Sequence, residues 1–219
     1  MALVSERFIA PEQLDDAPEE IVRGSLHDLT RINRYLGGHL VLRSLFRGLV
    51  KPHEEFSVLD VGAGSGDLAA ALRGMYPGAQ VTLLDHRLLH LAEAPPPKVV
   101  ADAFRLPFGP ASFDFVFSSL FLHHFSNDQV VDLLASFRNV ARRAVLAIDL
   151  DRGPLAYYFL PATRWLFRWR DITVSDGQIS VQAAFKQEEL QALAVQAGLG
   201  WARVKVHRPW SRLSLAAPF

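Results

Sequence analysis

The spacing of hydrophobic residues changes several times along the chain. Residues 19–50 carry apolar side chains three and four positions apart, which predicts two helices separated by Gly37-Gly38. Beyond residue 56, short apolar runs alternate with segments of helical spacing. The runs at 58–61, 80–85, 99–100, 112–119 and 144–150 predict parallel strands, and the alternation at 201–207 and 211–217 predicts a final hairpin.

Strands that alternate with helices predict an α/β fold, a doubly wound and mostly parallel sheet of seven strands with an antiparallel edge strand. We expect a single domain over residues 1–219. Its expected parts are a helical lead-in (1–53), a cofactor-binding core (54–152), an inserted aromatic lid (153–185) and a final helix and hairpin (186–219). Within the lid, Asp176-Gly177 predicts a turn.

Composition narrows the possible functions. The chain has 219 residues, no cysteine, and 23 basic against 23 acidic residues, so its formal net charge is zero. A nucleic-acid partner is disfavoured, because such proteins usually carry a basic excess. The N-terminal residues lack a secretion-signal pattern, and no uncharged apolar run reaches the roughly 18 residues of a membrane span. A cytoplasmic location is therefore expected.

The strand at 58–61 leads into a turn with glycines at Gly62, Gly64 and Gly66 and then into a helix. Glycine lets backbone N–H groups approach a ligand closely, and the helix N-terminus adds a partial positive charge. This arrangement predicts a nucleotide-like ligand at the carboxyl end of the sheet. Asp85, at the tip of the next strand, is placed to accept hydrogen bonds from ribose hydroxyls.

Two acids around the turn narrow the choice of ligand. Dinucleotide-binding proteins use G-x-G-x-x-G, whereas here Asp67 occupies the place of the last glycine. A carboxylate at this point repels a pyrophosphate, and Asp60 adds to the repulsion. Both acids suit a ligand with a positively charged amino group.

The segment from Val58 to Gly66 resembles the first motif of the class I S-adenosylmethionine-dependent methyltransferases, whose sheet is Rossmann-like. The resemblance covers about residues 54–150 and implies that S-adenosyl-L-methionine is the cofactor. It also implies that Asp60 and the turn hold the methionine portion, that Asp85 binds the ribose and that Asp102 accepts from the adenine amino group. The full set of implied cofactor-binding residues is Asp60, Gly62, Ala63, Gly64, Gly66, Asp85, His86, Asp102, Ala103, Ser118 and Ser119.

One position departs from that pattern, because His86 stands where an aliphatic residue usually packs on adenine. The lead-in from Ile32 to His39 resembles a subgroup of bacterial small-molecule methyltransferases that are distant relatives of the quinone-biosynthesis enzymes. This second resemblance implies a lipophilic aromatic or polyketide-like acceptor.

His123 and His124 match a histidine pair that is common in this family just after the fourth strand. Either histidine could serve as the general base for a phenol or an activated carbon acceptor, and we expect at most one of them to face the site. No metal is expected in the site. O-methylation is slightly favoured over C-methylation.

The acceptor pocket is expected to come from the lead-in and the lid, which lie outside the shared core. The aromatic content of the lid predicts an apolar acceptor, with Tyr35, Tyr157, Tyr158 and Trp165 as candidate contacts. Because arginines interleave with the aromatic residues over 153–170, this segment could instead touch a membrane surface. The alternative is a purely structural role, in which the aromatic side chains fill the core between lid and sheet.

Two other functions stay open at this point. An NAD-dependent oxidoreductase is the main alternative on the fold alone. A non-catalytic cofactor-binding protein on the same fold is the other, and it predicts cofactor binding with a blocked acceptor pocket.

Overall fold

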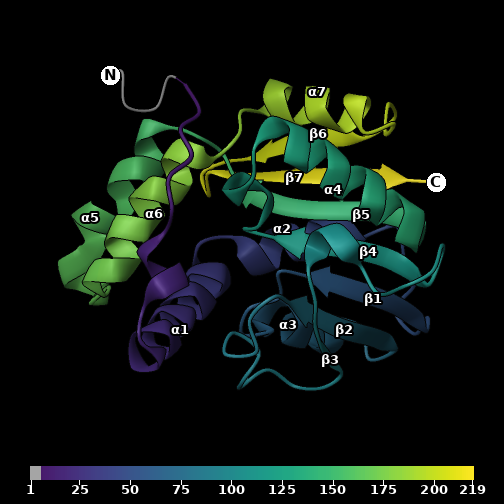
Figure 1. Cartoon of the computed structure of the whole chain (residues 1–219), viewed down its shortest axis with the longest axis horizontal. Coiled ribbons are helices and arrows are strands. Elements are labelled where there is room, and N and C mark those ends of the chain that lie inside the picture. The colour runs from purple at the N-terminus through teal and green to yellow at the C-terminus, as the bar shows by residue number, and fades with distance from the viewer. Residues whose placement is uncertain (1–5) are drawn as a thin grey trace.

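A computed structural model describes residues 6–219, apart from the side chains of residues 15 and 16, and contains one seven-stranded sheet (Figure 1). The strand order is β3-β2-β1-β4-β5-β7-β6. The strands are β1 (Phe56–Val61), β2 (Ala79–Asp85), β3 (Lys98–Val100), β4 (Phe113–Ser119), β5 (Ala141–Leu150), β6 (Arg203–His207) and β7 (Arg212–Pro218). The first five strands run parallel, and β7 runs antiparallel to both β5 and β6. The predicted fold is therefore confirmed, with the reversed strand placed one position inside the edge.

Helices cover both faces of the sheet. The α-helices are α1 (Glu19–Tyr35), α2 (Gly38–Phe46), α3 (Asp67–Met75), α4 (Asn127–Val140), α5 (Pro154–Phe167), α6 (Asp171–Ala183) and α7 (Gln187–Gln196). Within residues 6–219, the short 3-10 helices η2 (Gln13–Asp16), η3 (Ala103–Arg105) and η4 (Leu122–His124) lie in the connections. Helices α4 and α7 share a core with one face of the sheet, and α2 and α3 share a core with the other.

The two cores follow from the alternation of side chains along each buried strand. In β1, Leu59 and Val61 belong to the core under α4 and α7, whereas Phe56 and Val58 belong to the core under α2 and α3. Because both faces are covered, β1 is mostly apolar, as expected of a central parallel strand. Ser57 and Asp60 are the exceptions, and Asp60 lies one residue before the end of the strand.

The pair α5–α6 and helix α1 lie at the left of Figure 1, beyond one end of the strands. They pack on one another: α5 contacts α6, and α6 contacts α1, η2 and η4. The N-terminal segment runs along this group, and Phe8 donates its backbone N–H to the carbonyl of Gln182. The predicted lead-in and lid thus meet in space at one end of the sheet.

The predicted turn at Asp176-Gly177 is wrong, since α6 continues through it. A Cβ built on Gly177 would lie 2.4 Å from a methyl carbon of Leu160 in α5. This glycine therefore permits close packing of two helices instead of reversing the chain. Among the described residues, no helix combines the length and apolar character that crossing a bilayer requires.

Candidate functional site

A cavity of about 1030 Å³ opens where the parallel strands end. Its wall combines the glycine turn and strand ends of the core with α1, α5, α6 and the N-terminal segment. Single-ligand pockets span about 300–1,000 Å³, so this volume has room for a cofactor together with a small acceptor. Of the residues expected in the site, those that line it are Gly62, Ala63, Gly64, Asp85, His86, Asp102, Ala103, Ser119, His123 and His124. Asp60, Gly66 and Ser118 lie behind this wall.

The glycine turn requires left-handed backbone at each of its three glycines, with φ of +71° at Gly62, +52° at Gly64 and +71° at Gly66. At Gly62 the space is also closed, because an added Cβ would lie 2.3 Å from the ring of Phe121. The backbone N–H of Gly62 donates to the carbonyl of Leu84 over 2.8 Å, which fixes the turn against β2. Sequence and geometry therefore agree that only glycine suits this turn.

Asp85 ends β2 beside the turn and is 5% exposed. Its carboxylate accepts from the backbone N–H of Gly64 (3.2 Å) and of Arg87 (3.1 Å), and one oxygen lies 3.1 Å from Nδ1 of His90. Burial alone would raise the pKa of Asp85, but these contacts outweigh it and lower the pKa. Asp85 is therefore an anion that faces the cavity, as a ribose-binding group must be. His90, which the sequence motifs did not indicate, also lines the cavity four residues beyond His86.

Asp60 and Asp67 differ in their access to the cavity. Asp60 is 3% exposed and does not line the cavity, and burial, together with the charges of Asp67 and Asp85, raises its pKa well above the usual range. Asp67 lies at the first position of α3 and does line the cavity. The carboxylate within reach of a ligand is therefore that of Asp67.

A polar cluster lines the cavity beyond the tips of β4 and β5, on the other side of β1 from Asp85 at the tip of β2. Nδ1 of His123 lies 2.6 Å from Oδ1 of Asp149, and Nε2 of His123 lies 3.7 Å from Oε1 of Glu12. The ring of His124 stands 4.2 Å from that of His123, with its Nδ1 3.8 Å from the same oxygen of Glu12. Both rings line the cavity, so the expectation that at most one histidine would face it is wrong. The short η4 turn places the two rings side by side.

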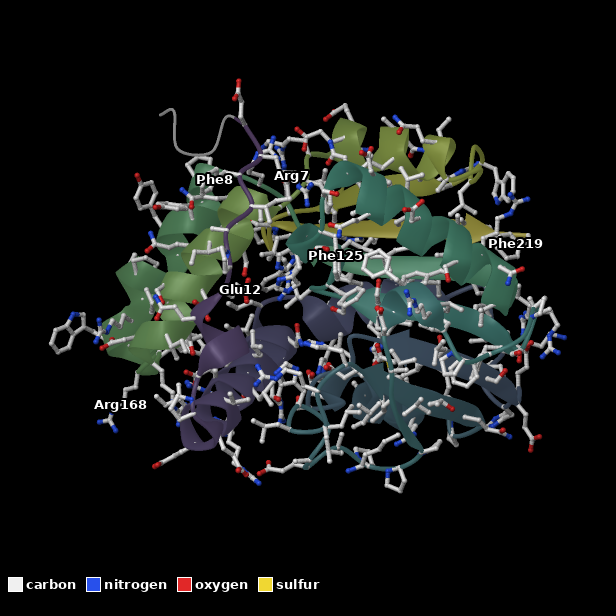
Figure 2. All side chains as sticks on the ribbon, viewed as in Figure 1. Arg7, Phe8, Glu12, Phe125, Arg168 and Phe219 are labelled. Atoms are coloured by element: carbon white, nitrogen blue, oxygen red, sulfur yellow. The ribbon has the colours of Figure 1, made fainter. Side chains whose placement is uncertain are left out.

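Glu12 belongs to the N-terminal segment and lies between the lid and the body of the protein (Figure 2). The hydroxyl of Ser180, from α6, donates to its carboxylate. Arg7 fastens the same segment by donating to the backbone carbonyls of His123 (3.0 Å) and Phe125 (2.6 Å). Glu12 could not be recognised as a site residue from the sequence, because an acid in an irregular N-terminal segment matches no motif.

Charges around His123 set its protonation state. Burial alone would lower its pKa, but the charge and hydrogen bond of Asp149, together with the nearby carboxylate of Glu12, outweigh burial and raise the pKa to about 9. Burial likewise would raise the pKa of Glu12, but His123, His124 and Ser180 together lower it. At neutral pH, His123 is therefore an imidazolium held between two carboxylates.

The structure does not bring the four candidate substrate residues to the cavity. Trp165 is 94% exposed, Tyr35 60% and Tyr158 57%, and Tyr157 also lies outside the lining. The helical period explains the difference: the lid residues that face the cavity are Leu155, Ala156, Phe159, Leu160, Gly177, Ser180 and Val181. Without knowing the phase of α5, the sequence could not separate its inner face from its outer face.

Parts of the chain are similar in sequence to known methyltransferases. Residues 59–149 match the family described as Methyltransferase domain. Over 118 residues, 47% of this chain, the sequence is 36% identical to a malonyl-[acyl-carrier protein] O-methyltransferase of Laribacter hongkongensis. Over 144 residues, 60% of this chain, it is 28% identical to the ubiquinone/menaquinone biosynthesis C-methyltransferase UbiE of Paracoccus denitrificans. The chain spans 39% and 55%, respectively, of the length of these two relatives.

Solved structures share the fold at low sequence identity. A magnesium protoporphyrin IX methyltransferase from Synechocystis, solved with bound SAH (S-adenosylhomocysteine), has a TM-score of 0.56 at 18% identity, with 83% of each chain covered. A putative O-methyltransferase from Nostoc punctiforme has a TM-score of 0.60 at 16% identity, covering 83% of this chain and 55% of that one.

Residues 59–149 therefore match a methyltransferase domain in sequence, and the chain shares the fold of solved S-adenosylmethionine-dependent methyltransferases. The relatives reported above include both an O-methyltransferase and a C-methyltransferase. They are both methyltransferases, but they differ in the kind of atom that receives the methyl group.

Proposed function

We propose that the protein is an S-adenosyl-L-methionine-dependent methyltransferase that acts on a small apolar acceptor, ring-containing or polyketide-like, with methylation on oxygen. One observation carries the proposal. A single cavity is lined by the glycine turn and Asp85 at the tips of β1 and β2, by the His123–His124–Glu12 cluster beyond the tip of β4, and by apolar side chains of α1, α5 and α6. A donor and an acceptor held in this space would lie side by side.

The donor fits the core end of the cavity. Asp85 accepts hydrogen bonds from the ribose hydroxyls. Asp102 lines the part of the cavity that would hold the adenine, and its Oδ1 also accepts from the N–H of Phe104 at the start of η3. The glycine turn leaves room for backbone N–H groups to meet the ligand closely. The exposed ring of His86, in the family's adenine-contacting position, can stack on the purine.

The acceptor end of the cavity supplies apolar contact and a proton acceptor. Phe159 and Leu160 of α5 and Leu29 of α1 form apolar wall, which suits a lipophilic acceptor. Methyl transfer is an in-line displacement: the acceptor oxygen forms a bond to the methyl carbon while the carbon–sulfur bond breaks. Holding both reactants in line supplies much of the acceleration.

The proton of an acceptor hydroxyl needs a destination. His123 already carries a proton at neutral pH, so it is a poor base and instead positions the cluster as a fixed cation. His124 is more accessible, with its side chain 35% exposed, and Glu12 faces its ring. We therefore assign the general base to His124, with Glu12 stabilising the imidazolium that forms.

Two measurements test this function. Isothermal titration with S-adenosylhomocysteine tests the donor end, and methyl transfer from labelled S-adenosylmethionine to a panel of phenols, hydroxyquinones and polyketide-like acids tests the acceptor end. Donor binding without transfer to any acceptor would favour the non-catalytic alternative. Tight NAD binding without binding of the homocysteine product would favour the oxidoreductase.

The outer face of α5 supports a separate part of the proposal, peripheral membrane contact through residues 153–170. Tyr158, Trp165 and Leu166 are exposed there beside Arg164 and Arg168. Arg168 lies at the outer edge of the lid in Figure 2. Sedimentation with anionic liposomes tests this contact. The expected cytoplasmic location, the absence of a nucleic-acid partner and the single-domain organisation stay predictions.

A further inference from the structure

We propose that Arg212 binds a carboxylate on the methyl acceptor, so that the acceptor combines an apolar body with one acidic group. The inference rests on the proposed function, because it concerns the acceptor side of the same cavity. It makes Arg212 a specificity-determining residue, whereas the hydroxyl that receives the methyl group stays with His124.

Arg212 is a buried cation with an unused hydrogen-bond donor. It begins β7 opposite Leu150, lines the cavity and is 1% exposed. Its Nη1 is buried without a hydrogen-bond partner among the described residues, and its Nη2 lies 3.4 Å from Oδ1 of Asn33, a long contact. Burial lowers the pKa of Arg212 to about 10 against the charges of Asp149 and Asp67, so the group stays a cation at neutral pH. A buried guanidinium in this state is costly unless an anion meets it.

The carboxylate of Asp149, on the strand that pairs with β7, does not satisfy this guanidinium. Its Oδ1 lies 2.6 Å from Nδ1 of His123 and accepts from the backbone N–H of Leu150 over 2.8 Å. Its Oδ2 accepts from the backbone N–H of His123 over 3.2 Å. The hydrogen bonds of Asp149 therefore go to the histidine and to the strand, and Nη1 of Arg212 is left for a group that enters the cavity.

The sheet places Arg212 on the acceptor side of the cavity. The glycine turn follows β1, and two strands, β4 and β5, lie between β1 and β7 (Figure 1). At about 4.8 Å per strand, the axis of β7 lies about 14 Å from that of β1. Arg212 pairs with Leu150, directly after Asp149, and therefore lies at the carboxyl end of β5, next to the residue that holds His123.

Asn33 separates the guanidinium from the carboxylate beside the glycine turn. It is 6% exposed, its Oδ1 faces Arg212, and its Nδ2 lies 3.4 Å from Oδ1 of Asp67. Asp67 begins α3 directly after Gly66, where the donor is expected. The side-chain amide of Asn33 thus stands between the acid of the donor side and the cation that we assign to the acceptor.

A carboxylate is the chemical group that matches this donor. A guanidinium presents its N–H groups in a planar fork, and the two oxygens of a carboxylate accept from it side by side. The hairpin that carries Arg212 also contributes apolar wall to the cavity through Pro209 and Trp210. An acceptor with one carboxylate on an apolar body suits a wall of this kind.

Wild-type protein allows a test from the ligand side. The probes are phenols that carry a carboxylic acid on a short or a long alkyl chain, each paired with its primary amide, and they are titrated into protein saturated with S-adenosylhomocysteine. We expect at least one acid to bind at least about 30-fold more tightly than its own amide, because a buried charge-assisted hydrogen bond replaces a neutral one. A panel in which no acid binds more tightly than its amide, or in which no probe binds, would overturn the inference. Failure of S-adenosylhomocysteine to bind would instead refute the proposed function.

Substitution of Arg212 tests the named residue. In Arg212→Gln, the affinity for the preferred acid should fall by about 30-fold, to that of its amide, while the amide and S-adenosylhomocysteine bind within about threefold of wild type. Arg212→Lys should keep part of the preference for the acid, because it restores the charge without the planar fork. The matched control is Arg203→Gln, which changes an exposed arginine on β6 and should leave the binding of acid, amide and S-adenosylhomocysteine unchanged.

Circular dichroism and thermal melting establish that each variant is folded. A folded Arg212→Gln variant that still prefers the acid would overturn the assignment. A loss of S-adenosylhomocysteine affinity as large as the loss for the acid would also overturn it, because Arg212 would then serve the donor. Equal losses for acid and amide would do the same, because the damage would then lie in the shape of the pocket. If Arg212→Gln does not fold, the wild-type ratio of acid to amide affinity and Arg212→Lys still decide the question.

Discussion

The two ends of the cavity are built in different ways. The proposed donor end consists of backbone turns and strand tips of the sheet, namely the glycine turn, Asp85 and Asp102. The proposed acceptor end consists of side chains from segments far apart in the sequence: Glu12 before α1, His124 after β4 and Phe159 in α5. A site formed by local backbone geometry leaves a sequence motif, whereas a site assembled by tertiary packing leaves none. Substitutions at the two ends are therefore expected to change different quantities: cofactor affinity at the donor end, and kcat or the acceptor KM at the acceptor end.

The largest expected effect lies at the donor end. Gly62→Ala places a Cβ against the ring of Phe121 at a backbone conformation with φ of +71°, so the turn must distort. We expect S-adenosylhomocysteine affinity, measured by titration calorimetry, to fall at least about 100-fold. The control is Gly74→Ala in α3, where no atom lies within 4 Å of an added Cβ. This control should bind normally and be slightly more stable, by about 0.5–1 kcal/mol. Equal donor binding by both variants would contradict the role of the turn.

At the acceptor end, His124→Ala should lower kcat for methyl transfer by about 10²–10³-fold, the usual contribution of a general base. Donor affinity should stay within about twofold of wild type, because His124 belongs to the other end. His53→Ala, an exposed histidine outside the cavity, is the matched control and should be fully active. An active His124→Ala enzyme would assign the proton to another group or to water.

The His123 cluster predicts a dependence of stability on pH. The pKa of His123 is about 9 in the folded protein, above the unfolded value of 6.5. Its contribution to stability is therefore full below pH 6.5 and is lost as the pH rises to about 9. At about 1.4 kcal/mol per pKa unit, the loss amounts to a few kcal/mol. Urea unfolding at pH 6, 7.5 and 9.5 should show this fall, and His123→Gln should flatten it. A wild-type curve that is flat across this range would refute the charged cluster.

The smallest effects separate the two faces of α5. Phe159→Ala removes apolar wall from the acceptor end and should raise the acceptor KM by about tenfold, with kcat little changed. Trp165→Ala changes a side chain that is 94% exposed and should leave KM unchanged and stability within about 0.5 kcal/mol. If Trp165→Ala instead lowers binding to anionic liposomes, the outer face of α5 contacts membrane.

The difference between local backbone geometry and tertiary packing also decides which parts of the fold and of the site the sequence could predict. Apolar spacing predicted every strand of the sheet and the helices on both of its faces, because buried parallel strands need continuous apolar runs. The motif also identified the glycine turn, whose backbone conformation depends on residues next to one another. At Gly177 the same kind of signal was misleading, since a glycine that admits Leu160 cannot be told from a turn glycine in sequence.

At the acceptor end only the histidine pair His123–His124 was named from the sequence, through its match to the family, because the other members are related only through packing. Glu12 reaches the histidines through the contacts of Arg7 and Ser180, and none of these spacings recurs in a pattern. Tyr35 and Trp165 looked like substrate contacts by residue type, but the phases of α1 and α5 turn them to solvent.

Titration of the wild-type protein with S-adenosylhomocysteine and, separately, with NAD tests the central claim most directly. The donor end described here predicts saturable binding of S-adenosylhomocysteine with one site per chain and no measurable binding of NAD, since Asp67 stands where a pyrophosphate would need positive charge. Binding of NAD without binding of S-adenosylhomocysteine would contradict it.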